Sequence, residues 1–232
     1  MFDLDGTLIE TAPEIGDAVN DTLRDAGLPS VSLADVQRWI GHGTFALLVK
    51  AVASVTGQDI DQVSDSDDLR ALAPRFDQHY EARCGTRSHP YPGVRETLDV
   101  LRAQGVRMAV VTNKEARYTE AILTRDGLRA YFDVVISGNS LPARKPDPSG
   151  ALSVMKQLAI SPERALFVGD SIIDVATARN AGIAVHLFPH GYNLGQSVND
   201  AGADRVLDNV DQLRSLFTTT PARHLRAVLW DV

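Results

Sequence analysis

The chain has 232 residues, of which 44% are hydrophobic and 23% are charged, a balance typical of a folded globular protein and not of a disordered one. The formal net charge of -7 provides no basic surplus for a broad nucleic-acid surface, so we expect no nucleic-acid partner. No apolar run approaches the roughly 20 residues of a membrane helix, and no basic-then-apolar leader precedes the first motif, so we expect a cytoplasmic protein without a membrane partner.

The first ten residues, MFDLDGTLIE, contain two aspartates two positions apart. Alternate side chains of an extended segment share a face, so Asp3 and Asp5 would repel each other there unless a cation lies between them. The chain can also avoid this repulsion by turning, and Gly6 suits a sharp turn in which the backbone approaches a ligand. The motif therefore indicates either a metal site or a tight turn.

Residues 12–88 are predicted to form an all-helical insert. Apolar residues recur at helical spacing in TAPEIGDAVNDTLRDAG, LADVQRWIG, TFALLVKAVASVTG and LRALAPRFDQHYEARCG, without a convincing strand. Ser32 followed three residues later by Asp35 resembles a capping box, which predicts a helix start. The lone cysteine of the chain, Cys84, cannot form an internal disulfide, in keeping with a reducing compartment.

Strands and helices alternate from residue 89 onward. GVRMAVVTNK, FDVVISG, ALFVGD and IAVHLF are apolar runs of strand length, and EARYTEAILTRDG, DPSGALSVMKQLAI and SIIDVATARNAG have helical spacing. This alternation predicts a parallel sheet covered on both faces. We therefore predict an α/β fold with two parts: a doubly wound, Rossmann-like core of residues 1–11 and 89–232, and the helical insert.

Polar residues stand at the carboxyl ends of the predicted strands. They are Asp3 and Asp5, Thr112 and Asn113, and Asp170, with Lys145 in the loop after FDVVISG. Ligands of open α/β sheets bind in the crevice beyond these strand ends, so we expect the groups to converge. Each residue alone also fits a turn, a helix cap or a solvated surface position.

The ordered pattern of DxDGT, a later Thr, a Lys before Pro, and GDxxxD resembles the haloacid dehalogenase superfamily over nearly the whole chain. The resemblance implies an α/β core with a helical cap. It also implies that Asp3 attacks phosphorus to give an aspartyl-phosphate, while Asp5 protonates the leaving alcohol and then activates water. Thr112 and Lys145 would bind the phosphoryl oxygens with the backbone N–H groups of residues 4–6. Gly6 and Asn113 would complete that phosphate-binding set.

The same resemblance implies a Mg²⁺ ion. Its ligands would be the carboxylates of Asp3 and Asp170 and the main-chain carbonyl of Asp5. Asp174, one turn beyond Asp170, would orient a metal-bound water or Lys145. Alternatively, Asp174 has only a structural role, as an acidic residue that the helix dipole favours in the first turn of a helix.

Asp5 restricts the reaction class within the superfamily. Dehalogenase relatives typically lack an acid at this position, because a halide leaving group needs no proton. The resemblance therefore favours hydrolysis of a small phosphorylated metabolite. A β-phosphoglucomutase-like phosphotransferase also keeps both acids and the cap, so it stays an alternative.

Three further stretches resemble phosphoglycolate phosphatases, namely VQRWIGHGTFALLVKA, HYEARCGTRSHPYPGV and HGYNLGQSVNDAGADRVLDNVDQL. This resemblance makes 2-phosphoglycolate the expected substrate. Gly41, His42 and Gly43 would join two cap helices and bind the substrate, although asparagine is expected where His42 stands. His42 could pair with the substrate carboxylate, and the alternative is a surface histidine in a helix-to-helix turn.

The two ends of the sequence raise a separate hypothesis. Two residues precede Asp3, fewer than a central strand usually has, and HLRAVLWDV near the other end resembles what precedes DxDGT in this family. Residues 225–232 would then pair near the first strand, within a monomer or across a homodimer. The alternatives are a misassigned start with an unrelated tail, and an inactive phosphate-binding fold. A receiver domain would also use Asp, Thr, Lys and Mg²⁺, but it explains neither the helical insert nor GDxxxD.

Overall fold

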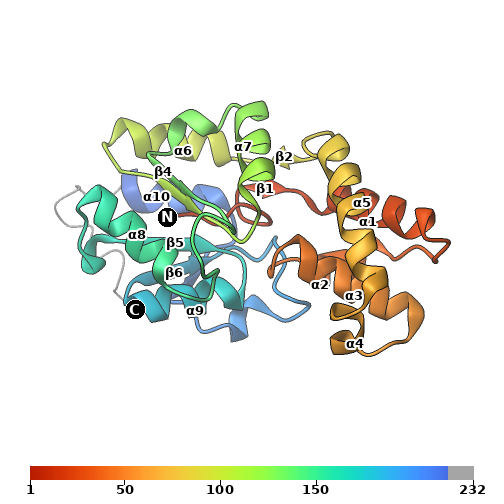
Figure 1. The fold of residues 1–232 in the computed structure, drawn as a ribbon. Helices are drawn as coiled ribbons and strands as arrows, with labels where there is room; N and C mark the ends of the chain where they lie inside the picture. Colours follow the sequence, from red (N-terminus) through yellow and green to blue (C-terminus); the bar gives the residue numbers. More distant parts are fainter. Residues whose placement is uncertain (219–232) are drawn as a thin grey trace.

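The computed structural model describes residues 1–218 as an α/β core joined to a helical cap (Figure 1). The strands are β1 Ile9–Glu10, β2 His89–Pro90, β3 Ala109–Val111, β4 Val134–Ile136, β5 Leu166–Gly169, β6 Ala184–Leu187 and β7 Arg205–Val206. The helices of the cap are α1 Ala12–Asp25, α2 Leu33–Trp39, α3 Thr44–Thr56, α4 Ile60–Ser64 and α5 Asp67–Arg83. Those of the core are α6 Val94–Ala103, α7 Ala116–Arg125, α8 Ser149–Leu158, α9 Ile172–Ala181 and α10 Val210–Thr218, with 3-10 turns at Arg129–Tyr131, Pro162–Arg164 and Val198–Asp200. The proposed pairing of residues 225–232 lies outside the described residues.

The first three residues occupy the centre of the sheet. Phe2 forms parallel bridges to Val110 of β3 and Val168 of β5, and the Asp3 N–H donates to the carbonyl of Val168 at 2.9 Å. The other strands pair in parallel, β3 with β4, β5 with β6, and β6 with β7. The order across the sheet is therefore β7, β6, β5, residues 1–3, β3 and β4. Backbone pairing on both sides holds this short segment in place.

Helices cover both faces of the sheet. Val110 and Val168 pack with apolar residues of α6, α7 and α10. Val111 and Phe167 face the other way and pack with α8 and α9. This alternation follows from the two-residue period of a strand. Figure 1 shows α6 and α10 on one side of the strands and α8 and α9 on the other, which confirms the doubly wound parallel sheet.

The cap helices surround an apolar cluster of their own, which includes Leu23, Leu48 and Phe76. The helix start at Ser32 is confirmed, because the hydroxyl of Ser32 accepts the N–H of Asp35 at 3.1 Å. The helix α4, which the sequence analysis did not predict, contributes the buried Val63 to this cluster.

Two adjacent connections join the cap to the core. The strand β1 pairs antiparallel with β2, so that Ile9 lies opposite Pro90. The buried carboxylate of Glu14, on α1, accepts the N–H of Ser88 at 3.0 Å and ties the returning connection to the cap. The predicted boundaries, after residue 11 and after residue 88, fall beside this pair of short strands and stay predictions.

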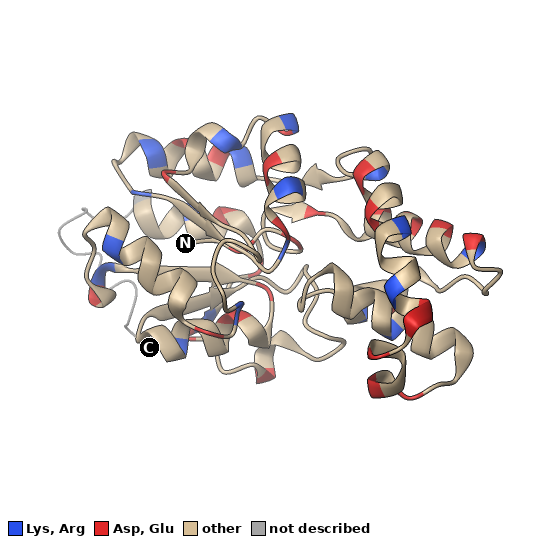
Figure 2. Cartoon of the chain, viewed as in Figure 1, with Lys and Arg blue, Asp and Glu red and all other residues tan. Residues whose placement is uncertain are grey.

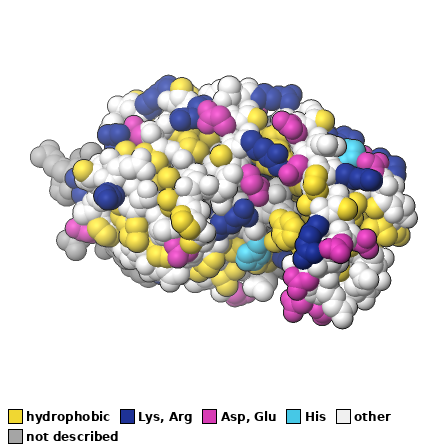
Figure 3. Space-filling model, viewed as in Figure 1, with side chains coloured by type: hydrophobic (Ala, Val, Ile, Leu, Met, Phe, Trp, Pro, Cys, Tyr) yellow, Lys and Arg dark blue, Asp and Glu magenta, His cyan; other side chains and the backbone are white. Residues whose placement is uncertain are grey.

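Charged residues of both signs are distributed over core and cap (Figure 2). The face shown in Figure 3 carries basic and acidic side chains interspersed with apolar ones. Within residues 1–218, no helix combines the length and the apolar character needed to cross a bilayer.

Candidate active site

A tight turn follows the first strand at the carboxyl edge of the sheet. Gly6 has φ +81, a conformation that L side chains rarely adopt, and a Cβ atom at this position would lie 2.4 Å from Oδ2 of Asp170. The Gly6 N–H donates to the carbonyl of Ile9 at 2.9 Å. Glycine is therefore required both by the backbone and by the close approach of Asp170.

Lys145 connects two buried carboxylates. It lies in the loop after β4, and its Nζ atom is 2.9 Å from Oδ1 of Asp3 and 2.7 Å from Oδ1 of Asp174. Burial disfavours the charged ammonium, but the Asp174 and Asp3 carboxylates outweigh it and raise the pKa of Lys145. Lys145 is therefore a fixed positive charge beside Asp3.

Asp174 also holds the start of α9. Its Oδ2 accepts the N–H and the hydroxyl of Ser171 at 3.1 Å and 2.9 Å, and the N–H of Asp170 at 3.1 Å. Asp170 is in turn held by the hydroxyl of Thr7 at 2.9 Å and by the N–H of Tyr192. Bonds within GDxxxD therefore hold the Asp174 carboxylate, whereas residues distant in the sequence hold the Asp170 carboxylate.

Asp3, Asp170 and Asp174 form a buried acidic cluster whose ligand atoms all lie within 4.8 Å of one another. Burial raises the pKa of Asp3 and of Asp170, and the neighbouring Asp174 carboxylate raises both further. Lys145 neutralises one of the three negative charges. The remaining charge and the oxygen donors fit a hard divalent cation.

Thr112 and Asn113 follow β3 and have different surroundings. Thr112 is buried and lines the cavity between core and cap. The side-chain amide of Asn113 donates to the carbonyls of Gly41 at 2.8 Å and Lys145 at 3.0 Å, and its oxygen accepts the N–H of Lys145 at 2.9 Å. The side-chain amide of Asn113 therefore connects the Lys145 loop with the cap. Asn113 also lines the cavity.

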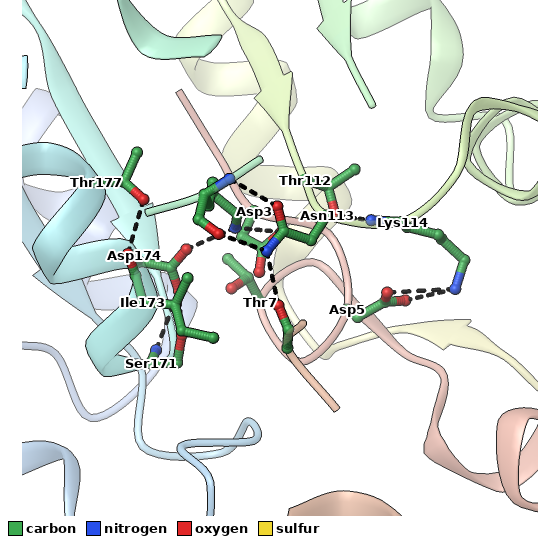
Figure 4. Close-up of polar contacts among 12 residues, drawn as sticks. Asp3, Asp5, Thr7, Thr112, Asn113, Lys114, Ser171, Ile173, Asp174 and Thr177 are labelled. Carbon is green, nitrogen blue, oxygen red and sulfur yellow. Dashed lines mark hydrogen bonds and ion pairs between the residues drawn. The ribbon is translucent and has the colours of Figure 1, made fainter. Parts of the chain in front are cut away.

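Asp5 lies apart from the acidic cluster and pairs with a second lysine (Figure 4). The Nζ atom of Lys114 is 3.0 Å from Oδ1 and 3.2 Å from Oδ2 of Asp5, and it also donates to the hydroxyl of Tyr80 on the cap helix α5. Thr11 donates its hydroxyl to Oδ1 of Asp5 at 2.7 Å. Burial opposes the charge of Lys114, but Asp5 outweighs it and raises the pKa of Lys114.

A cavity of about 30 Å³ lies between core and cap. Its lining comprises Asp3, Asp5, Thr112, Asn113, Lys114, Asp170, Ser171 and Tyr192 of the core, and Ile15, Ile40, Gly41, Gly43, Thr44 and Leu47 of the cap. His42 is exposed and does not belong to this lining. Partial desolvation and the nearby Lys50 lower the pKa of His42, which favours its neutral form at pH 7.

The structure therefore brings most of the predicted site residues to one edge of the sheet. Asp3, Lys145, Asp170 and Asp174 meet directly, and Asp5 lies on the other side of the same cavity. Gly41 and Gly43 reach this cavity from the cap, whereas His42 does not. The sequence analysis missed six residues that hold the site, namely Thr7, Thr11, Tyr80, Lys114, Ser171 and Tyr192. The position of Lys114 in the sequence could have indicated its place in the site, because it directly follows Thr112 and Asn113 at a strand end.

Comparison with known proteins agrees with this arrangement. The family model described as haloacid dehalogenase-like hydrolase matches residues 1–188. A protein named phosphoglycolate phosphatase from Nitrosospira multiformis is 41% identical over 217 residues, which cover 94% of each chain. One of the same name from Pseudomonas putida is 39% identical over 213 residues, 92% of this chain and 77% of the relative.

A solved structure of a similar protein has the same fold. The crystal structure of a predicted phosphoglycolate phosphatase from Haemophilus somnus superposes with a TM-score of 0.87 at 34% sequence identity. The match covers 93% of this chain and 95% of that one. The similarity therefore extends over the core and the cap together.

Proposed function

The chain belongs to the haloacid dehalogenase-like hydrolase family and is a phosphatase, and we propose that it hydrolyses 2-phosphoglycolate through a covalent intermediate on Asp3. The observation that carries this proposal is the pairing of Asp3 with Lys145 in a buried acidic cluster, with a second carboxylate, Asp5, across the same cavity. A nucleophile, a cation beside it and a separate acid are the groups that phosphomonoester hydrolysis requires.

In the first step, an oxygen of Asp3 attacks phosphorus and the bond from phosphorus to the ester oxygen breaks. The protonated carboxyl group of Asp5 gives its proton to the departing alkoxide, so that a neutral alcohol leaves. Lys145 and Thr112 stabilise the charge that builds up on the phosphoryl oxygens. The product of this step is an aspartyl-phosphate and a free alcohol.

In the second step, the Asp5 carboxylate takes a proton from a water molecule that attacks the aspartyl-phosphate. The bond between phosphorus and Asp3 breaks, which releases inorganic phosphate and restores both carboxyl groups. Thr11 and Lys114 hold the side chain of Asp5 at the cavity, so one group can serve both steps.

A Mg²⁺ ion suits the acidic cluster. Asp3 and Asp170 would hold it with the main-chain carbonyl of Asp5, and Asp174 would hold Lys145 and the start of α9 beside it. When bound, Mg²⁺ supplies positive charge that favours ionised Asp3 and offsets the charge of the phosphoryl group. The observation that supports a cation here is the buried cluster of three carboxylates, whose ligand atoms lie within 4.8 Å of one another.

The substrate assignment rests on the relatives and on the place of the cavity. The cavity lies between core and cap, so both parts adjoin the group that departs from phosphorus. The relatives named phosphoglycolate phosphatase support 2-phosphoglycolate among small esters. The lone Cys84 supports a cytoplasmic setting.

Phosphate release from a panel of esters tests the proposal. The panel contains 2-phosphoglycolate, sugar monophosphates including β-glucose 1-phosphate, and nucleoside monophosphates, each with Mg²⁺. We expect the highest kcat/KM for 2-phosphoglycolate. A preference for another ester would show that the substrate assignment is wrong. Conversion of β-glucose 1-phosphate to glucose 6-phosphate would show that the reaction is phosphoryl transfer and not hydrolysis. Binding of esters without phosphate release, by folded protein, would leave a phosphate-binding protein.

A further inference from the structure

We propose that Lys114 binds the carboxylate on the alcohol side of the substrate and thereby selects phosphate esters of short hydroxy acids. The inference rests on the proposed function, since it assigns the specificity of that same site. Lys114 is a specificity-determining residue in this account, and Asp3 and Asp5 carry the chemistry.

The first argument is position. The Nζ atom of Lys114 lies 3.0 Å from Oδ1 of Asp5, the group that must contact the ester oxygen to protonate it. A single methylene separates the ester oxygen of 2-phosphoglycolate from its carboxylate. A cation beside the general acid is therefore within reach of that carboxylate, whereas Lys145 lies beside Asp3 on the phosphoryl side.

The second argument is charge. Three aspartates line the cavity, namely Asp3, Asp5 and Asp170, and they would repel a substrate carboxylate. The cap contributes the apolar side chains of Ile15, Ile40 and Leu47, which offer a carboxylate no hydrogen bonds, and the hydroxyl of Thr44, which donates to Glu115 at 2.9 Å. Among the described residues, Lys114 is the one cation that lines this cavity.

The third argument is that the neighbouring cations do not line the cavity, whereas Lys114, although paired with Asp5, does. Lys145 pairs with Asp3 and Asp174. The guanidinium of Arg144 donates to the carbonyl of Gly138 at 2.7 Å and does not belong to the cavity lining. His42 is exposed outside that lining.

The fourth argument is that Lys114 is held in place. Its side chain is 1% exposed, and it connects Asp5 of the core with the hydroxyl of Tyr80 on the cap. Ion pairs are stronger in such a desolvated site than at a surface. The lysine also adjoins both parts of the molecule, so a carboxylate bound there would be enclosed by core and cap together.

Two matched esters test the proposal. We would compare kcat/KM for 2-phosphoglycolate with kcat/KM for 2-hydroxyethyl phosphate, in which a hydroxymethyl group replaces the carboxylate. The wild type should prefer 2-phosphoglycolate, and Lys114→Met should reduce this ratio by about 10- to 100-fold, the typical effect of losing a charged hydrogen bond. Any damage to Asp5 affects both esters and cancels in the ratio.

Three further variants and the wild type complete the design. Lys50→Met removes a nearby cap cation outside the cavity lining and should leave the ratio within about twofold, as expected for a surface change. His42→Ala tests the competing assignment, and a fall in the ratio there with none in Lys114→Met would overturn the proposal. If Lys114→Met does not fold, the ratio of the two kcat/KM values, measured in Lys114→Arg and in the wild type, decides whether the proposal holds. Equal kcat/KM for both esters in the wild type would refute the inference alone, whereas no phosphate from either ester would refute the proposed function.

Discussion

The Nζ atom of Lys145 lies 2.9 Å from Oδ1 of Asp3, although the two residues are far apart in the sequence. The parallel sheet explains this meeting, because the first strand and β4 both end at the edge where ligands bind. Lys145 also contacts Asp174, so one ammonium pairs with both Asp3, the proposed nucleophile, and the start of α9.

Asp174→Asn should raise the Mg²⁺ concentration needed for half-maximal activity by about 10- to 100-fold, the usual effect of losing a group that orients metal ligands. The substitution keeps the size of the side chain but removes a charge from the acidic cluster. Activity titrated with Mg²⁺ measures the effect. Asp147→Asn, on the exposed part of the Lys145 loop, is the matched control. An unchanged Mg²⁺ requirement in Asp174→Asn would remove Asp174 from the metal site.

Asp5→Asn should separate the two chemical steps. With p-nitrophenyl phosphate the leaving group departs without a proton, so Asp3 can still be phosphorylated, whereas hydrolysis of the aspartyl-phosphate lacks its base. We expect a burst of p-nitrophenolate close to one equivalent per enzyme, followed by turnover about 100- to 10,000-fold slower than in the wild type. Stopped-flow absorbance measures both phases. Wild-type turnover without a burst would contradict the role of Asp5.

Asp21→Asn should destabilise the cap at neutral pH. Asp21 of α1 accepts hydrogen bonds from Arg83 of α5 and, at 2.8 Å, from Arg24. Burial raises the pKa of Asp21, but the hydrogen bonds from Arg83 and Arg24 outweigh it and lower the pKa below 3.8. A lowered folded-state pKa stabilises the fold above the unfolded pKa of about 3.9, and this stabilisation is lost as pH falls through the folded value.

Urea unfolding at pH 7 and at pH 3 measures this contribution. The free energy of unfolding of Asp21→Asn should fall by about 1 kcal/mol at pH 7, since Arg83 is partly solvated. The difference from the wild type should shrink at pH 3. Asp68→Asn, an exposed acid on α5, is the control and should change stability by less than about 0.5 kcal/mol. A difference that is larger at pH 3 than at pH 7 would contradict the assigned pKa direction.

Local pattern was sufficient to predict that polar residues at the strand ends meet at one edge of the sheet. Apolar runs of strand length place Thr112 and Asp170 at strand ends, and the parallel sheet then carries both to one edge. The helix start at Ser32 could also be predicted from local sequence, because it depends on the Ser32 side chain and on the N–H of Asp35, three residues later. The helices α4, α6 and α10 and the short strands β1, β2 and β7 were not predicted.

Long-range packing accounts for the features that the sequence did not reveal. Tyr80 and Lys114 are 34 residues apart, and their contact depends on how α5 of the cap packs against Tyr118 of α7 in the core. The first strand looks too short in the sequence, but hydrogen bonds from both neighbouring strands place Phe2 in the sheet. Neither arrangement leaves a periodic signal in the chain.

The central claim is hydrolysis of a phosphate ester by attack of Asp3, and phosphate release from 2-phosphoglycolate tests it most directly. We would measure the wild type with Mg²⁺ and with EDTA, and Asp3→Asn with Mg²⁺, after thermal unfolding has shown that both proteins are folded. The account predicts turnover in the wild type with Mg²⁺, and loss of turnover in EDTA and in Asp3→Asn. Sustained phosphate release by folded Asp3→Asn at the wild-type rate would contradict it.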